Sequence, residues 1–129
     1  MGVRSSTVIA VCLCAGLASA QQSPVTRTEL QKLAYPDQGH QAATYRVTVA
    51  PGGVIARHTH PGVEMGYLVS GEGTLSVRGQ PDRALKAGDS WAIPADTPHT
   101  LKALGDGQTL AVVTFVTEAG KPLATPAPE

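Results

Sequence analysis

Two histidines and a glutamate lie close together near the middle of the sequence, between Gly52 and Gly73. Successive side chains of an extended strand point to opposite faces, so His58 and His60 are expected to share one face. The Pro-Gly pair that follows favours a turn, which would bring Glu64 back beside the histidines. One metal ion could then reach all three side chains. A further histidine, His99, follows a second segment marked by glycine and proline.

The first twenty residues have the pattern of a secretory signal peptide. Arg4 gives a positive n-region, residues 7–18 form an apolar core, and Ala18-Ser19-Ala20 is a small-x-small cleavage site. A membrane-spanning helix needs about 20 apolar residues, and this core is shorter. Both cysteines of the chain lie inside the segment. We therefore expect a secreted, periplasmic protein whose mature chain begins at Gln21 and contains no cysteine.

The remaining length and charge limit the possible functions. Removing the first twenty of 129 residues leaves 109, enough for one domain with a single core. Loss of Arg4 changes ten basic and ten acidic residues to nine and ten, a net charge near −1. Without a basic run, this balance argues against nucleic acid or an anionic membrane surface as partners. No membrane association is expected after cleavage of the signal peptide.

Short strands separated by turns are expected over most of the chain. Alternating or continuous apolar runs are bounded by segments rich in Gly, Pro and Asp, and nothing there has helical periodicity. The pattern predicts an all-β sandwich or closed barrel, whose last strand is expected to be buried on both faces. The strands are expected at residues 44–50, 54–60, 65–70, 73–77, 83–85, 90–93, 99–104 and 109–117.

The segments outside these strands give weaker signals. Residues 21–43 are interpreted as an N-terminal extension in which 25–33 forms an edge strand, with a short helix as the alternative. The turn formers at 36–39 (PDQG) predict a turn. Residues 44–117 would form the barrel. Residues 118–129 form a proline-rich tail, expected to be extended over the surface or disordered.

The spacing of glycines, prolines and candidate ligands resembles the two sequence motifs of the cupin superfamily. The first segment is Gly52-x5-His58-x-His60-x3-Glu64-x6-Gly71, and the second is Gly88-x5-Pro94-x-Asp96-x2-His99. This resemblance covers about residues 44–116. It implies a single-domain, small jelly-roll β-barrel, and by position it implies that one divalent metal is bound by His58, His60, Glu64 and His99.

These donors limit the metal without selecting one. Imidazole nitrogens with one carboxylate oxygen and no thiolate suit Fe, Mn, Ni, Zn, Co or Cu. On an octahedral ion, four protein ligands leave two positions for water, dioxygen or a chelating substrate. On tetrahedral zinc they close the shell. In the alternative without a metal, His58 and His60 are exposed edge-strand residues, Glu64 is a solvated turn residue and His99 ends a loop.

Two positions depart from the cupin motifs. Asp96 occupies a position where glycine is usual, and aspartate is one of the few residues that tolerate the left-handed backbone glycine would supply. Ala103 occupies a position that often holds asparagine and supports the site or the substrate. The second departure bears on catalysis more than on metal binding.

The resemblance implies a metal-dependent enzyme that acts on a small molecule, with a dioxygenase, isomerase, decarboxylase or lyase reaction all open. The competing hypothesis is a non-catalytic module that binds a small ligand or a metal, which Ala103 and the few polar residues favour. A homodimer is expected because small cupins commonly pair through their sheets.

Other residues have a structural or peripheral interpretation. Trp91 is expected in the core and His40 on the surface. Four further side chains could line a pocket mouth and orient an anionic substrate, although Arg57 alternates away from the histidine face. They are Tyr45, Tyr67, Arg46 and Arg57.

Overall fold

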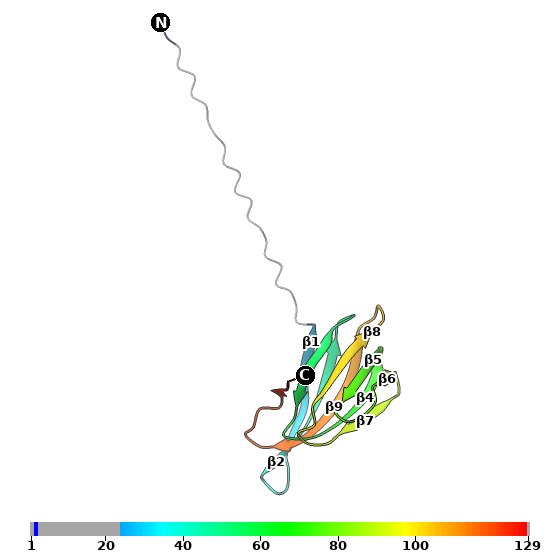
Figure 1. Ribbon diagram of the computed structural model, residues 1–129. Helices are drawn as coiled ribbons and strands as arrows, with labels where there is room; N and C mark the ends of the chain where they lie inside the picture. Colours follow the sequence, from blue (N-terminus) through cyan, green and yellow to red (C-terminus); the bar gives the residue numbers. More distant parts are fainter. Residues whose placement is uncertain (1, 3–23, 129) are drawn as a thin grey trace.

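The computed structural model describes residue 2 and residues 24–128, and in this part the chain forms ten β-strands and no helix (Figure 1). The rest of the predicted signal peptide and its cleavage site lie outside the described residues. The strands are β1 (Val25–Ala34), β2 (His40–Val49), β3 (Val54–Thr59), β4 (Gly62–Ser70), β5 (Glu72–Val77), β6 (Arg83–Lys86), β7 (Ser90–Ile93), β8 (His99–Leu104), β9 (Thr109–Glu118) and β10 (Thr125–Pro126).

The strands form two antiparallel sheets of five strands each. One sheet has the order β1-β2-β9-β4-β7, and the other has the order β10-β3-β8-β5-β6. Strands distant in the sequence lie side by side, as β2 and β9 do over their whole length. The two sheets face each other (Figure 1), and the side chains packed between them form one apolar core. This arrangement confirms the predicted all-β jelly-roll barrel.

Period-two alternation explains which side chains enter the core. On β9, Ala111, Val113 and Phe115 are buried, and the residues between them are half-buried. The expectation that this strand is buried on both faces was therefore wrong. Its outer face is covered by no further layer of the described chain, so only the inner face packs in the core.

The predicted strands are confirmed, with small shifts at their ends. The segment 25–33 is the edge strand β1 and not a helix, and β2 begins at His40, four residues earlier than expected. The expected turn at 36–39 connects these two strands. The C-terminal tail is extended, and its short strand β10 pairs with β3. Among the described residues, no helix is long and apolar enough to cross a membrane.

Candidate metal centre

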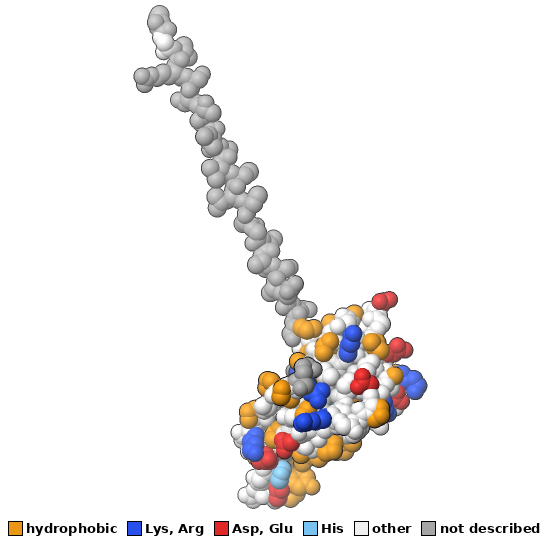
Figure 2. Space-filling model, viewed as in Figure 1, with side chains coloured by type: hydrophobic (Ala, Val, Ile, Leu, Met, Phe, Trp, Pro, Cys, Tyr) orange, Lys and Arg blue, Asp and Glu red, His pale blue; other side chains and the backbone are white. Residues whose placement is uncertain are grey.

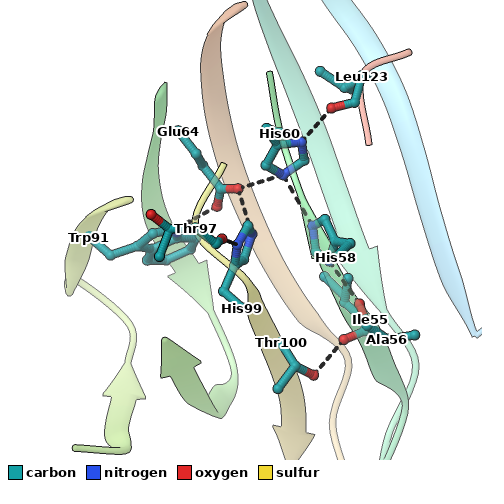
Figure 3. A network of polar contacts seen from close by, with 10 residues as sticks. All are labelled: Ile55, Ala56, His58, His60, Glu64, Trp91, Thr97, His99, Thr100 and Leu123. Atoms are coloured by element: carbon teal, nitrogen blue, oxygen red, sulfur yellow. Dashed lines mark hydrogen bonds and ion pairs between the residues drawn. The ribbon is translucent and has the colours of Figure 1, made fainter. Parts of the chain in front are cut away.

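Four side chains from neighbouring strands meet inside the barrel (Figure 3). His58 lies in β3, His60 directly follows β3, Glu64 lies in β4 and His99 begins β8. All four are buried, with exposed fractions of 3–8%. One ligand atom of each lies within 4.8 Å of the others. The structure therefore brings together all four residues that the sequence predicted, and none of them is an exposed edge or turn residue.

A β-bulge in β3 aims His58 into the barrel. Ile55 pairs with Leu101 and His58 pairs with His99, so two residues of β3 lie opposite one residue of β8. Thr100 fixes the bulge, because its hydroxyl donates a hydrogen bond of 2.6 Å to the carbonyl of Ile55. Such an extra residue re-aims the side chains that follow it. Ile55 and His58, three positions apart, therefore line the same cavity.

The loop before β8 is tied to the first pair of histidines. Asp96 has a positive φ of 55°, which confirms the expectation that it takes the left-handed conformation in place of glycine. In this conformation its backbone N–H donates a 2.9 Å hydrogen bond to the carbonyl of His60. The two motifs are thus joined through the backbone, and His99 follows three residues after the joint.

Backbone carbonyls fix the tautomer of each buried histidine. The Nδ1 atoms of His58, His60 and His99 lie 2.7, 2.6 and 2.8 Å from the carbonyl oxygens of Ala56, Leu123 and Thr97 respectively. A carbonyl oxygen can only accept a hydrogen bond, so each Nδ1 carries the proton and donates it. In the neutral imidazole the opposite nitrogen, Nε2, then holds a lone pair. All three Nε2 lone pairs point into the cluster.

The Nε2 atoms and the Glu64 carboxylate form an assembly of electron donors that needs a cation. His58 Nε2 lies 3.1 Å from His60 Nε2, and Glu64 Oε2 lies 2.9 and 3.1 Å from the Nε2 atoms of His60 and His99. With each Nδ1 protonated, neutral imidazoles have no proton to place between these atoms. A shared proton or a metal ion removes the repulsion.

The distances also fit one divalent ion. Two donor atoms bound at about 2.1 Å and at right angles lie about 3.0 Å apart. The three short contacts in the cluster are 2.9–3.1 Å, close to that separation. The nitrogen and oxygen donors suit a transition metal. The residues present can therefore hold one divalent metal ion, through His58, His60, Glu64 and His99.

Trp91 holds the carboxylate of Glu64. Its indole Nε1–H donates a 2.7 Å hydrogen bond to Oε1, which leaves Oε2 toward the histidines. Gly66 makes room for the indole, because a Cβ at this position would lie 2.1 Å from two ring carbons of Trp91. Trp91 is buried as expected, but its contact with Glu64 was not predicted.

Burial and these polar contacts shift two pKa values in the cluster. Burial lowers the pKa of His58 to about 4, against the smaller opposite effect of its hydrogen bond to Ala56. Burial alone would raise the pKa of Glu64. Hydrogen bonds from His60 and His99, in the state in which they share a proton with the carboxylate, and from Trp91 outweigh burial and hold this pKa well below its ordinary value of 4.5. Both shifts favour the forms that bind a metal, the neutral imidazole and the ionised carboxylate.

The cavity beside the cluster is small and mostly apolar. Its volume is about 40 Å³, and core side chains such as Val47 and Phe115 line it together with the four candidate ligands. Arg27 of β1 also reaches it, which the sequence analysis missed. Of the residues proposed for the pocket mouth, Tyr45, Tyr67, Arg46 and Arg57, none lines this cavity. Tyr45 instead donates a hydrogen bond to Glu29.

His40 lies away from the cluster, and Leu123 lies beside it. His40 is far more exposed than the candidate ligands, and its Nδ1 lies 2.6 Å from an Asp37 carboxylate oxygen. It therefore plays no part in the cluster, as expected. Leu123 was not predicted, although its carbonyl accepts the hydrogen bond of His60. No side-chain type marks such a contact, because the acceptor is backbone in a proline-rich tail.

Comparison with known families agrees with this architecture. The family model described as "Cupin domain" matches residues 45–116, more than half of the chain. The chain therefore belongs to the cupin family. A comparison with curated proteins gives no significant match.

Several solved structures share the fold. The DMSP lyase DddQ from Ruegeria pomeroyi DSS-3 is 26% identical with a TM-score of 0.60, over 67% of this chain and 43% of that chain. A recombinant oxalate oxidase in complex with glycolate is 24% identical with a TM-score of 0.65, over 83% and 57%. KdgF from Halomonas sp. is 22% identical with a TM-score of 0.64, over 77% and 84%. The chain spans less than two thirds of the first two proteins.

Proposed function

We propose that this protein is a metal-dependent enzyme that acts on a small molecule, with His58, His60, Glu64 and His99 as the metal ligands. The observation that carries the proposal is the set of converging lone pairs. Each imidazole donates its Nδ1–H to a carbonyl, so the three Nε2 atoms and Glu64 Oε2 have no proton to share in their neutral and ionised forms. A divalent ion satisfies all four donors at once.

The surroundings of the site limit the chemistry. A bound divalent ion supplies a Lewis acid that polarises an oxygen atom of a small molecule. Apart from the four ligands, the cavity is lined by apolar side chains, Trp91, Thr109 and Arg27. The protein therefore contributes mainly orientation, exclusion of water and the positive charge of Arg27, and its described residues offer no separate acid or base in this cavity. Dioxygenase, isomerase, decarboxylase and lyase reactions are all compatible with this arrangement, and the solved relatives include a lyase and an oxidase.

The second candidate is a non-catalytic protein that binds a metal or a small ligand. The size of the cavity favours it, because a volume of about 40 Å³ is small for an organic substrate. Ala103 favours it as well, since this buried residue offers no polar group to a substrate. A tetrahedral zinc ion bound by all four ligands would give such a closed site.

Metal binding is tested by reconstitution. The chelator-treated protein is loaded separately with Fe(II), Mn(II), Ni(II), Zn(II), Co(II) and Cu(II), and bound metal is measured by elemental analysis after desalting. We expect one ion per chain, and we expect His60→Ala to lose it. His40→Ala is the matched control, because this histidine lies outside the cluster. Full metal content in His60→Ala would contradict the proposed ligand set.

Catalysis is tested with the same loaded samples. Oxygen uptake with a panel of enols and phenols detects a dioxygenase, and product analysis by mass spectrometry with small carboxylic acids detects decarboxylation or elimination. Turnover with one metal that His60→Ala abolishes supports the enzyme. Co(II) in the zinc position reports the coordination geometry through its absorption spectrum. Absence of turnover with every metal, together with a tetrahedral spectrum of the Co(II) form, would establish the non-catalytic alternative.

We also propose that the protein is exported to the periplasm, with a mature chain that starts at Gln21, and that it forms a homodimer. The charged n-region, the short apolar core and the Ala18-Ser19-Ala20 site support export. N-terminal sequencing of the protein from the periplasmic fraction tests this, and an intact N-terminus there would contradict cleavage.

A further inference from the structure

A second cleft opens beside the metal cavity, between the edges of the two sheets. It lies between β1 at the edge of one sheet and β3 with β10 at the edge of the other. Its volume is about 270 Å³, several times that of the metal cavity. Arg27, Ile55 and His58 line both spaces. The cleft is therefore large enough for a small molecule and leads directly to a candidate metal ligand.

The lining of this cleft is positively charged. Its nine residues include Arg27 and Arg57 and no aspartate or glutamate. The remaining residues, apart from His58, are aliphatic or proline. In Figure 2 some of the blue side chains of lysine or arginine lie near the C-terminal end of the described chain, and Ala124 and Pro126 of this end line the cleft. Two positive charges in an apolar wall, next to a divalent metal site, attract an anion.

Neither guanidinium is used by the described part of the protein. Most arginines at a sheet edge could serve a surface ion pair, but the ion pairs of the described residues involve neither Arg27 nor Arg57. The Nε of Arg57 is moreover buried and has no hydrogen-bond partner. A buried donor without a partner is costly, because it has lost its hydrogen bonds to water. This Nε is closed to solvent, but Arg57 lines the cleft and its two terminal guanidinium nitrogens are not buried in the same way, so a ligand in the cleft can meet them.

The bulge in β3 explains why Arg57 lines the cleft at all. Two residues of β3, Ala56 and Arg57, lie opposite the single Thr100 of β8. The extra residue changes the local direction of the strand. The side of β3 that carries Arg57 is closed by the tail, whose Ala127 N–H donates to the Arg57 carbonyl at 3.0 Å. The same irregularity thus sets His58 toward the metal cavity and Arg57 toward the cleft.

We propose that this cleft binds the substrate through an oxyanion, a carboxylate or a phosphate group, held by Arg27 and Arg57 while the rest of the molecule reaches toward His58. The planar guanidinium offers paired N–H donors that match both groups. That the bound anion is a substrate rests on the proposed function, because only an enzyme has a substrate. The anion site itself requires only the two arginines.

Calorimetry on the chelator-treated protein tests the site without any turnover. The probes are malonate and glycerol phosphate, with malonamide and glycerol as their uncharged counterparts, in a buffer that contains no carboxylate or phosphate. We expect one or both anions to bind and the uncharged molecules to show no heat of binding. The anion that binds more tightly identifies the group. Failure to bind either anion would overturn the proposal, whatever the metal and activity measurements show.

Three substitutions localise the binding. Arg27→Met and Arg57→Met are each expected to weaken anion binding about tenfold or more, the effect of losing a charged hydrogen bond. Arg57→Lys keeps the charge and loses the paired guanidinium donors, so its anion affinity is expected to fall between those of the wild type and Arg57→Met. Arg46→Met, on the outer face of β2, is the matched control and should bind normally. Unchanged affinity in Arg27→Met and Arg57→Met, or an equal loss in Arg46→Met, would place the anion elsewhere and refute the assignment.

Discussion

Each candidate ligand is held on the side that faces away from the cluster. Carbonyl oxygens from three different segments accept hydrogen bonds from the Nδ1 atoms, and Trp91 donates one to the Glu64 carboxylate. Such partners orient a ligand and set its tautomer, and their loss weakens metal binding even though they never touch the ion. The geometry of the centre therefore depends on residues that carry no metal-binding group.

The contact between Trp91 and Glu64 gives a prediction at the level of one hydrogen bond. Phenylalanine at position 91 keeps an aromatic ring in the core but leaves Oε1 of Glu64 without its 2.7 Å donor. We expect Trp91→Phe to weaken binding of the divalent metal by about tenfold or more. Competition with a coloured chelator measures the affinity. Leu85→Val, a buried change in β6 outside the lining of the metal cavity, should keep it, and an unchanged affinity in Trp91→Phe would refute the role.

The buried histidine predicts how the metal-free protein responds to acid. In the unfolded chain His58 binds a proton near pH 6.5, whereas in the folded protein its pKa is about 4. Between these values the unfolded state binds more protons, so the free energy of unfolding should fall as pH decreases, by up to about 1.4 kcal/mol per pH unit. The lowered pKa of Glu64 costs stability only below its ordinary value of 4.5, so Glu64 does not contribute between pH 6.5 and 4.5.

Urea unfolding of the metal-free protein at a series of pH values measures this dependence. His58→Gln removes the titrating group and should flatten the slope between pH 6.5 and 4.5. Equal slopes in the wild type and His58→Gln would show that His58 is not held neutral by burial.

At the level of the elements, the C-terminal tail completes the second sheet and the metal centre together. Thr125 and Pro126 pair with Thr59 and His58, and the carbonyl of Leu123 accepts a hydrogen bond from Nδ1 of His60. The tail is thus an edge strand of the barrel beside the first two histidines. It also forms one wall of the arginine-lined cleft.

The strands of the barrel could be predicted from sequence, whereas the pairing of the tail with β3 could not. Period-two alternation and glycine-rich turns are local signals, so β2 to β9 were found with small shifts at their ends. His58, His60 and Glu64 lie within seven residues of one another, and the spacing to His99 follows a family motif. β10 instead owes its conformation to pairing with a strand more than sixty residues away. Its proline-rich sequence has no local pattern that predicts pairing with β3.

Removing the tail tests its part in the site. A chain that ends at Lys121 lacks Leu123 and β10, so Nδ1 of His60 loses its acceptor and β3 loses its neighbour on one side. We expect metal affinity to fall by about 10- to 100-fold, with a lower midpoint of thermal unfolding. A chain that ends at Ala127 keeps these contacts and is the control. Equal metal affinity in the two truncated chains would show that the tail does not orient His60.

On the whole molecule, one face of the first sheet is apolar and uncovered. Along β4, every second side chain points outward and is exposed, among them Met65 at 49% and Tyr67 at 51%. Val63 and Val69 extend this row, and half-buried valines of β9 lie beside it. Contiguous exposed apolar side chains on a flat sheet are typical of an interface. Because sheets pack well face to face, a second copy of the chain can cover this surface.

A single charged substitution on this surface tests the proposed homodimer. Met65→Glu places a carboxylate in the middle of the apolar row, and burying it in a dimer would cost its hydration without a partner. We expect sedimentation equilibrium to give a dimer for the wild type and a monomer for Met65→Glu, with metal content unchanged because the side chain points away from the cluster. Leu104→Lys, at an exposed apolar position on the other sheet, should remain dimeric. A monomeric wild type, or a dimer unaffected by Met65→Glu, would contradict pairing through this face.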